Sequence, residues 1–435
     1  MRVLFINRYF YPDHAPTGVL LSDIAFALSQ EGAQVTVITS RLRYDGTGTL
    51  PNRETVKGVE IYRVWTSQSG QSSLLRRSLD YGSFYLAGAW RLWRLARGAD
   101  IIVAKTDPPL LSVMVSGLAR LRGAKAVNWL QDVFPEVAEA LDVGGRSGRF
   151  ALRFMRFLRN WSLRTASTNV VVGNAMAAHL LREGVEPTKI RVISNWSDGN
   201  LIKPIAAAQN TLRQDWGLAG NFVVGYAGNL GRAHDVETII DAMTLLRQRA
   251  IRTPPNDVIR RIVFVFVGGG AQHEKLQQEV LRRQLTNVRI HPYQPQERLA
   301  ETVGVADVHL VSLKPELEGL IVPSKFYGIA AAGRPALFVG ASDGEIARLI
   351  NQAACGFTVS PGDAQELTCR ILQLASDPEL CSRMGASARV AFEEHWDKAH
   401  GVALWAEILH VPASKEAEIR TSDATGSATT PHLDK

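Results

Sequence analysis

Short apolar runs alternate with longer amphipathic stretches along the first half of the chain. A β-branched run over residues 2–7 is followed by an apolar-periodic stretch over 19–30 and a second apolar run over 34–39. Buried β-branched runs predict strands, and apolar positions at a period near 3.6 predict a helix, so this segment indicates a βαβ unit. Further runs that predict strands cover residues 59–64, 100–104, 124–130 and 169–173. Strands separated by helices indicate a parallel sheet.

The same alternation starts again near residue 221, after a polar, irregular stretch. The second set of predicted strands covers residues 222–226, 262–267, 288–290, 308–312 and 336–339. We therefore predict two Rossmann-like, doubly wound α/β domains over 1–196 and 221–410, with a hinge over 197–220. Residues 411–435 are predicted to form a disordered tail. Ligands of such sheets bind at the carboxyl ends of the strands, so we expect the site in a cleft between the domains.

The composition narrows the class of protein only modestly. The 435 residues are 46% hydrophobic, and the three cysteines show no zinc-binding spacing, which favours a reducing compartment. The apolar run at the start is too short for a signal peptide, and no stretch is long enough to predict a membrane-spanning helix. The net charge of +7 suits phosphate-bearing ligands or an anionic lipid surface. Charge alone is weak support for nucleic-acid binding, and none is predicted.

A glycine-bearing turn follows the first strand of the second domain, in the sequence GYAGNLGRAHDVETIIDA. Gly228 and Gly231 leave the backbone open just before a predicted helix, whose N-terminus attracts an anion. Arg232 and His234 add side-chain donors at the same end. A plain tight turn is the alternative.

Two further segments have the same character. Gly268, Gly269 and Gly270 end a strand before a helix, where they either admit a nucleotide or form a simple turn. In EGLIVPSKFYGIAAAGRP, Ser324 and Lys325 lie in the first turn of a helix that Pro323 begins, which predicts a second anion pocket. The alternative is that Glu318 and Lys325 are solvated loop charges.

These motifs, in this order, resemble the family 4 glycosyltransferases of the GT-B fold, in particular the bacterial enzymes of cell-surface polysaccharide synthesis. The start NRYFYPDHAPTGVLLSDIAFALSQ, the phrase VNWLQDVFPE and the segment YQPQERLAETVGVADVHLVSL match that subset in style. The resemblance covers the chain from the start to about residue 409.

The resemblance implies transfer of a hexose or N-acetylated sugar, with retention, from a nucleotide-diphosphate sugar to a lipid-linked or polysaccharide acceptor. It implies that the domain over 221–410 holds the donor and that the domain over 1–196 holds the acceptor. It also implies no cofactor and no metal, and the sequence contains no Asp-x-Asp. Positive groups must then stabilise the departing diphosphate. On this basis we predict four catalytic residues: Asp132, Arg232, Lys325 and Glu318. The predicted donor-binding residues are Gly18, Gly228, Asn229, Gly231, His234, Gly268, Gly269, Gly319, Leu320, Ile321, Val322 and Ser324.

The sequence departs from the family pattern at two places. A glutamate that the family uses to bind the nucleotide ribose is replaced by Gly328, so the ribose must be held differently. The Arg and Lys pair common after the first strand of the second domain is also altered, since Asn229 and His234 stand near those positions with Arg232 between them.

The first domain supplies weaker candidates. The loop before Gly18 is expected by resemblance to face the donor phosphates and the acceptor, although a structural turn explains it equally simply. Asp132 follows a strand and is a candidate general base, with Glu136 as a second candidate. An exposed loop acid is the alternative, and the histidine that many relatives carry in this region is absent.

Two segments combine arginines with aromatic residues, over 84–97 and 149–164. In the second, Phe150, Phe154, Phe157 and Trp161 follow a helical stripe. Such a helix binds an anionic membrane surface or, alternatively, packs its aromatic stripe into the core. We therefore expect a cytoplasmic protein, peripheral on the inner face of the membrane. The competing functions are a nucleotide-sugar epimerase of the same fold and a nucleotide or sugar binder with impaired catalysis.

Overall fold

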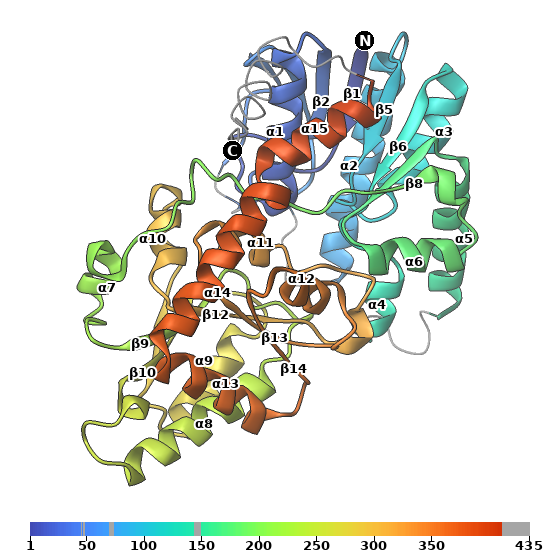
Figure 1. The fold of residues 1–435 in the computed structure, drawn as a ribbon. Coiled ribbons are helices and arrows are strands. Elements are labelled where there is room, and N and C mark those ends of the chain that lie inside the picture. The colour runs from blue at the N-terminus through green and yellow to red at the C-terminus, as the bar shows by residue number, and fades with distance from the viewer. Residues whose placement is uncertain (45, 47, 69–73, 143–148, 411–435) are drawn as a thin grey trace, which may run out of the picture. The chain divides into compact units, whose positions relative to one another are not determined.

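The computed structural model describes residues 1–44, 46, 48–68, 74–142 and 149–410, and Figure 1 shows its ribbon. Two compact units make up the chain: residues 1–127 together with the segment from Gly401 form the first, and Asn128–His400 form the second. The predicted tail over 411–435 lies outside the described residues.

Eight strands form the first sheet, in the order β3-β4-β2-β1-β5-β6-β7-β8, and the boundary between the units falls within β6. All its described pairings are parallel except that of β3 with β4, which is antiparallel. The strands are β1 (Arg2–Ile6), β2 (Gln34–Ser40), β3 (Arg53–Val56), β4 (Val59–Val64), β5 (Ile101–Ala104), β6 (Lys125–Trp129), β7 (Thr168–Val171) and β8 (Ile190–Val192). The helices between them are α1 (Pro16–Gln30), α2 (Leu74–Leu95), α3 (Leu111–Arg122), α4 (Glu136–Ala140), α5 (Arg149–Thr165) and α6 (Asn174–Arg182).

Six parallel strands form the second sheet, in the order β11-β10-β9-β12-β13-β14. They are β9 (Phe222–Ala227), β10 (Ile262–Val267), β11 (Val288–His291), β12 (Val308–Ser312), β13 (Ala336–Val339) and β14 (Gly356–Val359). The helices of this part of the chain are α7 (Thr211–Asp215), α8 (Glu237–Arg252), α9 (His273–Arg282), α10 (Leu299–Gly304), α11 (Lys325–Ala331), α12 (Glu345–Ala353), α13 (Ala364–Ser376), α14 (Pro378–Ala391) and α15 (Lys398–Ile408). The predicted α/β class with two doubly wound parallel sheets is therefore confirmed.

Each unit has its own apolar core. In the first, β1, β5 and α2 bury Leu4, Ile102 and Leu92. In the second, all six residues of β10 are buried, and Leu246 of α8 packs in the same cluster as Phe264. Fully burying each such side chain stabilises the fold by roughly 1.5–3 kcal/mol relative to exposure. These cores fix the strand ends at which the glycine turns begin.

Candidate active site

The two glycine turns of the second sheet interlock. They follow the neighbouring strands β9 and β10, and the N–H of Leu230 donates to the carbonyl of Gly269 at 2.7 Å. A Cβ on Gly268 would lie 2.5 Å from the carbonyl oxygen of Gly228, and the two residues have φ values of +132° and +113°. No L side chain fits such a contact, so these glycines allow the two turns to pack as one unit.

Lys325 reaches these turns from the start of α11. Its Nζ lies 3.6 Å from the centroid of the Tyr226 ring and 3.4 Å from the carbonyl oxygen of Asn229. Among the described residues, no carboxylate lies within ion-pair distance of Lys325. Burial lowers the pKa of the Lys325 ammonium well below its usual range. A half-buried ammonium held by a ring face and a carbonyl is a natural partner for an anion.

His234 contributes differently from the expectation that it would donate to an anion. Its Nδ1 lies 2.5 Å from the carbonyl oxygen of Ser312, which accepts only, so Nδ1 carries the hydrogen. Burial, together with the charge of Lys325, lowers the pKa of His234 to about 3. The imidazole is therefore neutral at neutral pH, with Nε2 as an acceptor, and adds no positive charge to the turn.

The turn after β9 has a further brace that the sequence did not reveal. The Gln272 side-chain amide donates to the carbonyls of Gly231 and His234, at 2.7 and 2.8 Å. Arg232, on the same turn, is exposed and forms no ion pair within the described ranges. Gln272 thus holds the backbone while Arg232 stays available to a ligand.

The carboxylate of Glu318 is used inside the second unit. Its Oε1 accepts a hydrogen bond of 2.8 Å from the N–H of Glu345, the first residue of α12. Burial raises the pKa of Glu318, with the nearby charges of Glu345 and Asp343 adding to the rise. Glu345 in turn accepts from the N–H of Ala175, at 3.2 Å, at the start of α6. Glu318 thus caps α12 in this structure, and its catalytic role stays a prediction.

The loop that follows Glu318 contacts the strand-end loop of β6. Asp132 and Ile321 form an isolated antiparallel bridge, and the N–H of Val133 donates to the carbonyl of Leu320 at 2.9 Å. The structure therefore places the predicted base beside the predicted donor loop, Gly319 to Val322. Ser324 is exposed at the start of α11.

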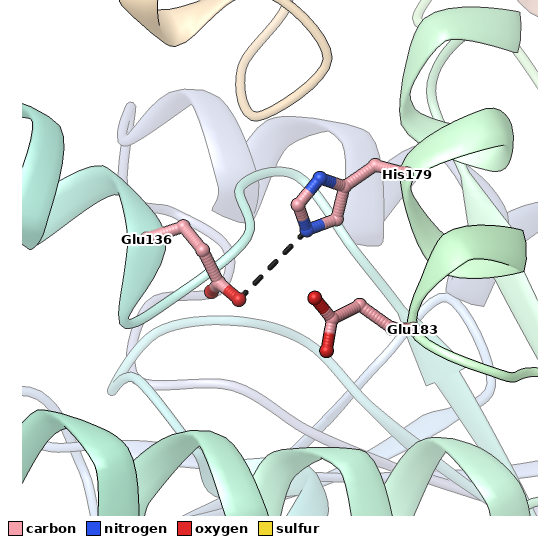
Figure 2. Close-up of side chains that lie close together, drawn as sticks. All are labelled: Glu136, His179 and Glu183. Atoms are coloured by element: carbon pink, nitrogen blue, oxygen red, sulfur yellow. Dashed lines mark ion pairs between the residues drawn. The ribbon is translucent and has the colours of Figure 1, made fainter.

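Glu136, the second candidate base, belongs instead to an ion-pair network. Figure 2 shows Glu136, His179 and Glu183, whose ligand atoms lie within 4.8 Å of one another, as a metal site would require. Arg159 pairs with Glu136, and Arg156 does so at 3.2 Å. Burial alone would raise the pKa of Glu136, but the hydrogen bond from His179 and the charge of Arg159 leave it below the ordinary value. Two guanidinium groups repel a cation, so the cluster fits a brace between α4, α5 and α6 better than a metal centre.

In the first unit, Gly18 is buried in the first turn of α1. A Cβ there would lie 3.2 Å from the carbonyl carbon and oxygen of Tyr9. The glycine is thus needed for close packing of α1 against the loop after β1. Its predicted role toward the donor stays a prediction.

Comparisons with known proteins agree with this architecture. Residues 17–196 match the model of a glycosyl transferase 4-like domain, and residues 208–391 match that of the glycosyl transferases group 1. The chain belongs to the family 4 glycosyltransferases of the GT-B fold.

Named relatives of this glycosyltransferase include the probable glycosyltransferase WbjE of Pseudomonas aeruginosa, which is 27% identical over 91% of this chain and 94% of its own length. The putative colanic acid biosynthesis glycosyl transferase WcaI of Escherichia coli (strain K12) is 25% identical, over 86% and 92%. Among solved structures, Anabaena HepE in complex with UDP-glucose superposes with a TM-score of 0.69 at 20% identity, over 95% of this chain and 100% of that one.

Gly328 stands where the family resemblance predicts a ribose-binding glutamate, and it faces the segment after β8. A Cβ on Gly328 of the glycosyltransferase would lie 3.6 Å from Cδ1 of Ile202 and 4.0 Å from Oγ of Ser197. Both distances are ordinary contacts, so a side chain is not excluded by the backbone at this position.

Three of the four aromatic residues in the α5 stripe face outward, and Trp161 is partly buried. Phe150, Phe154 and Phe157 are 83%, 58% and 67% exposed, so the interpretation of a stripe packed in the core is wrong for these three side chains. Arg153 and Arg164 are also exposed. On α2, Trp90 is 63% exposed. None of the described helices of the glycosyltransferase is both long and apolar enough to cross a membrane.

Proposed function

We propose that this glycosyltransferase transfers a hexose or N-acetylhexosamine from a nucleoside-diphosphate sugar to a lipid-linked or polysaccharide acceptor, with retention and without a metal or other cofactor. The observation that carries the proposal is the Lys325 ammonium, which lies over the Tyr226 ring beside the interlocked glycine turns. An anion bound beside these turns would pair with the positive charge of Lys325 in a partly desolvated site. Polysaccharide synthesis is supported by the colanic acid relative.

In this proposal the diphosphate leaves toward Lys325, Arg232 and the amides of the turn after β9. These groups stabilise the negative charge that develops as the bond to the sugar breaks. Asp132, next to the Gly319 to Val322 loop, orients the acceptor hydroxyl. Glu318 contributes by holding the loop in place, because its carboxylate caps α12.

A thermal-shift screen with UDP-, GDP-, ADP- and dTDP-sugars tests donor binding. A ligand at 100 times its dissociation constant adds about 2.7 kcal/mol to the free energy of unfolding. The UDP-glucose complex of HepE makes UDP-sugars the first choice. A protein that none of the four donors stabilises would contradict the proposal.

Lys325→Ala tests the charge assignment. Loss of a group that acts where charge develops lowers kcat by on the order of 10²–10³. Lys275→Ala is the matched control, because Lys275 lies on α9 of the same unit and pairs with Glu237 instead. Equal turnover by Lys325→Ala and the control would refute the role of Lys325.

A catalytically impaired nucleotide binder is the second candidate, favoured by Gly328 and by the use of Glu318 as a cap. The variant Gly328→Glu restores the missing carboxylate, and its donor affinity is the readout. Gain of affinity supports a ribose contact at this position. The names of the relatives favour transfer over epimerisation, and release of epimerised donor without acceptor is the test for the latter.

The acceptor side of the proposal includes an anionic membrane on the cytoplasmic face. Exposed Phe150, Phe154 and Phe157, at spacings of four and three residues, share one face of α5, and exposed arginines lie on the same helix, a combination typical of interfacial helices. We expect the double variant Phe154→Ser and Phe157→Ser to lose sedimentation with phosphatidylglycerol vesicles at low salt. Leu281→Ser is the control, since Leu281 is 79% exposed on α9. Undiminished sedimentation of the phenylalanine variant rejects this surface.

A further inference from the structure

Arg8 stands at the carboxyl edge of the first sheet, where ligands of such sheets bind. It follows β1 by two residues. Its N–H donates to the carbonyl of Asp107 at 2.8 Å, and its own carbonyl accepts from the N–H of Ser40 at 3.0 Å. These bonds tie Arg8 to the ends of the two strands that flank β1, so its backbone is fixed.

The side chain of Arg8 is held by two aromatic rings. Its guanidinium carbon lies 5.2 Å from the ring centroid of Tyr9 and 5.2 Å from that of Tyr81. The side chain is half-buried, and its Nε is buried without a hydrogen-bond partner. Within the described part of the chain, no carboxylate forms an ion pair with this guanidinium. Such a group loses hydration and gains no charge partner, which is costly unless a ligand supplies one.

The neighbourhood suits a sugar as well as an anion. The Tyr44 ring, 50% exposed, meets the Tyr9 ring edge-on at a centroid distance of 5.3 Å. Two acids carry charges that act on Tyr9: Asp107, whose carbonyl accepts from Arg8, and Asp13, which accepts from the N–H of Tyr44 at 2.7 Å. Buried Lys105 donates to the carbonyl of Thr17, in the first turn of α1, at 2.6 Å. Exposed aromatic rings stack on sugar rings, and a guanidinium binds phosphate or carboxylate through two parallel hydrogen bonds.

We propose that Arg8, between Tyr9 and Tyr81, binds a negatively charged group of the acceptor, a phosphate or a carboxylate next to the sugar that receives the new bond. The inference rests on the proposed function, because it takes the first unit as the acceptor side. The anionic group has three possible sources: a sugar phosphate, a uronic acid or a lipid diphosphate.

Binding of four probes to the full chain tests the proposal by titration calorimetry: glucose 1-phosphate, glucuronic acid, farnesyl diphosphate and, as the neutral reference, methyl α-glucoside. We expect at least one anionic probe to bind more tightly than the glucoside. Arg8→Gln should weaken that probe by about 10- to 100-fold, the loss of a charge-assisted contact. Arg8→Lys keeps the positive charge but loses the two parallel hydrogen bonds of the guanidinium, so it should weaken probe binding less than Arg8→Gln does. The anionic probe that binds identifies the source of the group.

Two controls separate this site from the donor site. Arg122→Gln should leave probe binding unchanged, since Arg122 stacks on Trp93 at the far end of α3. Lys325→Ala should abolish the stabilisation by UDP yet keep probe binding. Arg8→Gln should weaken probe binding yet keep the stabilisation by UDP. Equal probe affinity in Arg8→Gln and the wild type overturns the inference, as does loss of probe binding in Lys325→Ala alone or failure of every anionic probe to bind the wild type. Absence of stabilisation by UDP alongside intact Arg8-dependent binding would count against the proposed donor site and not against Arg8.

Discussion

Two ionisable side chains beside the Gly228 turn illustrate how burial decides charge. Burial and the charge of Lys325 lower the pKa of His234 to about 3, although the hydrogen bond to the Ser312 carbonyl acts in the opposite direction. Lys325 is also destabilised as a cation by burial, but it stands against a ring face and a carbonyl oxygen. The histidine is therefore a neutral spacer, and the lysine is the group that an anion stabilises.

The depressed pKa of His234 predicts acid sensitivity. Because the unfolded chain takes up a proton near pH 6.5 and the folded one only near pH 3, the unfolded state binds more protons between these values. The contribution of His234 to the free energy of unfolding is complete above pH 6.5. It falls as the pH drops below that value, by up to about 2 kcal/mol at pH 5. We expect His234→Asn to show a flatter decline in urea unfolding between pH 7.5 and 5.

A second buried histidine, His309, also contributes to the pH dependence of stability. Burial lowers the pKa of His309 to about 4, so a residual slope remains in His234→Asn. An unchanged slope in that variant would show that His234 is protonated equally in both states.

Some residues of the site could be predicted from the sequence and others could not. Lys325 follows Pro-Ser, a local pattern that predicts a helix start, and the structure has Lys325 as the first residue of α11. Its contact with the Asn229 carbonyl joins two motifs that the sequence pattern predicts as separate pockets. The capping role of Glu318 depends on Glu345, which is 27 residues away along the chain. No local pattern reports such a distant partner, so the capping role could not be predicted from the sequence.

At the scale of elements, the turns after β9 and β10 act together because their glycines touch. The sequence pattern predicts each turn separately, because it does not show that β9 and β10 are neighbours in the sheet. The strands themselves were predicted where they are buried. The pattern does not predict β3, β8 and β14, which lie at sheet edges and lack a continuous apolar run.

Substitution of one glycine tests the interlock. Gly268→Ala places a Cβ 2.5 Å from the Gly228 carbonyl and also imposes a left-handed φ on alanine. Gly362→Ala imposes the same kind of φ, +87°, with nothing within 4 Å of the new Cβ. We expect the control to cost about 1 kcal/mol of unfolding free energy and Gly268→Ala to cost at least twice that and to weaken donor binding. Equal costs, measured by urea unfolding, would mean that the turns do not constrain one another.

The whole molecule contains two units with separate cores, which predicts a selective effect of ligand. UDP at 100 times its dissociation constant should raise the unfolding free energy of the second unit by about 2.7 kcal/mol and leave the first unchanged. Leu92→Ala and Leu246→Ala assign the calorimetric transitions, because these leucines lie in the cores of the first and second unit. Each truncation is expected to cost about 2–5 kcal/mol. A uniform shift of both transitions by UDP would contradict the assignment of the donor to the second unit.

The carboxylates of Glu318 and Glu345 link three segments in series. Glu318 holds the first amide of α12, Glu345 holds an amide of α6, and a Cβ on Gly319 would lie 3.1 Å from the carbonyl oxygen of Ala175. A displacement of the loop from Gly319 to Val322 therefore affects the first turns of both α12 and α6. Binding of a ligand at that loop should slow amide exchange at Glu345 and Ala175 together, so that one contact makes two distant helix starts more rigid.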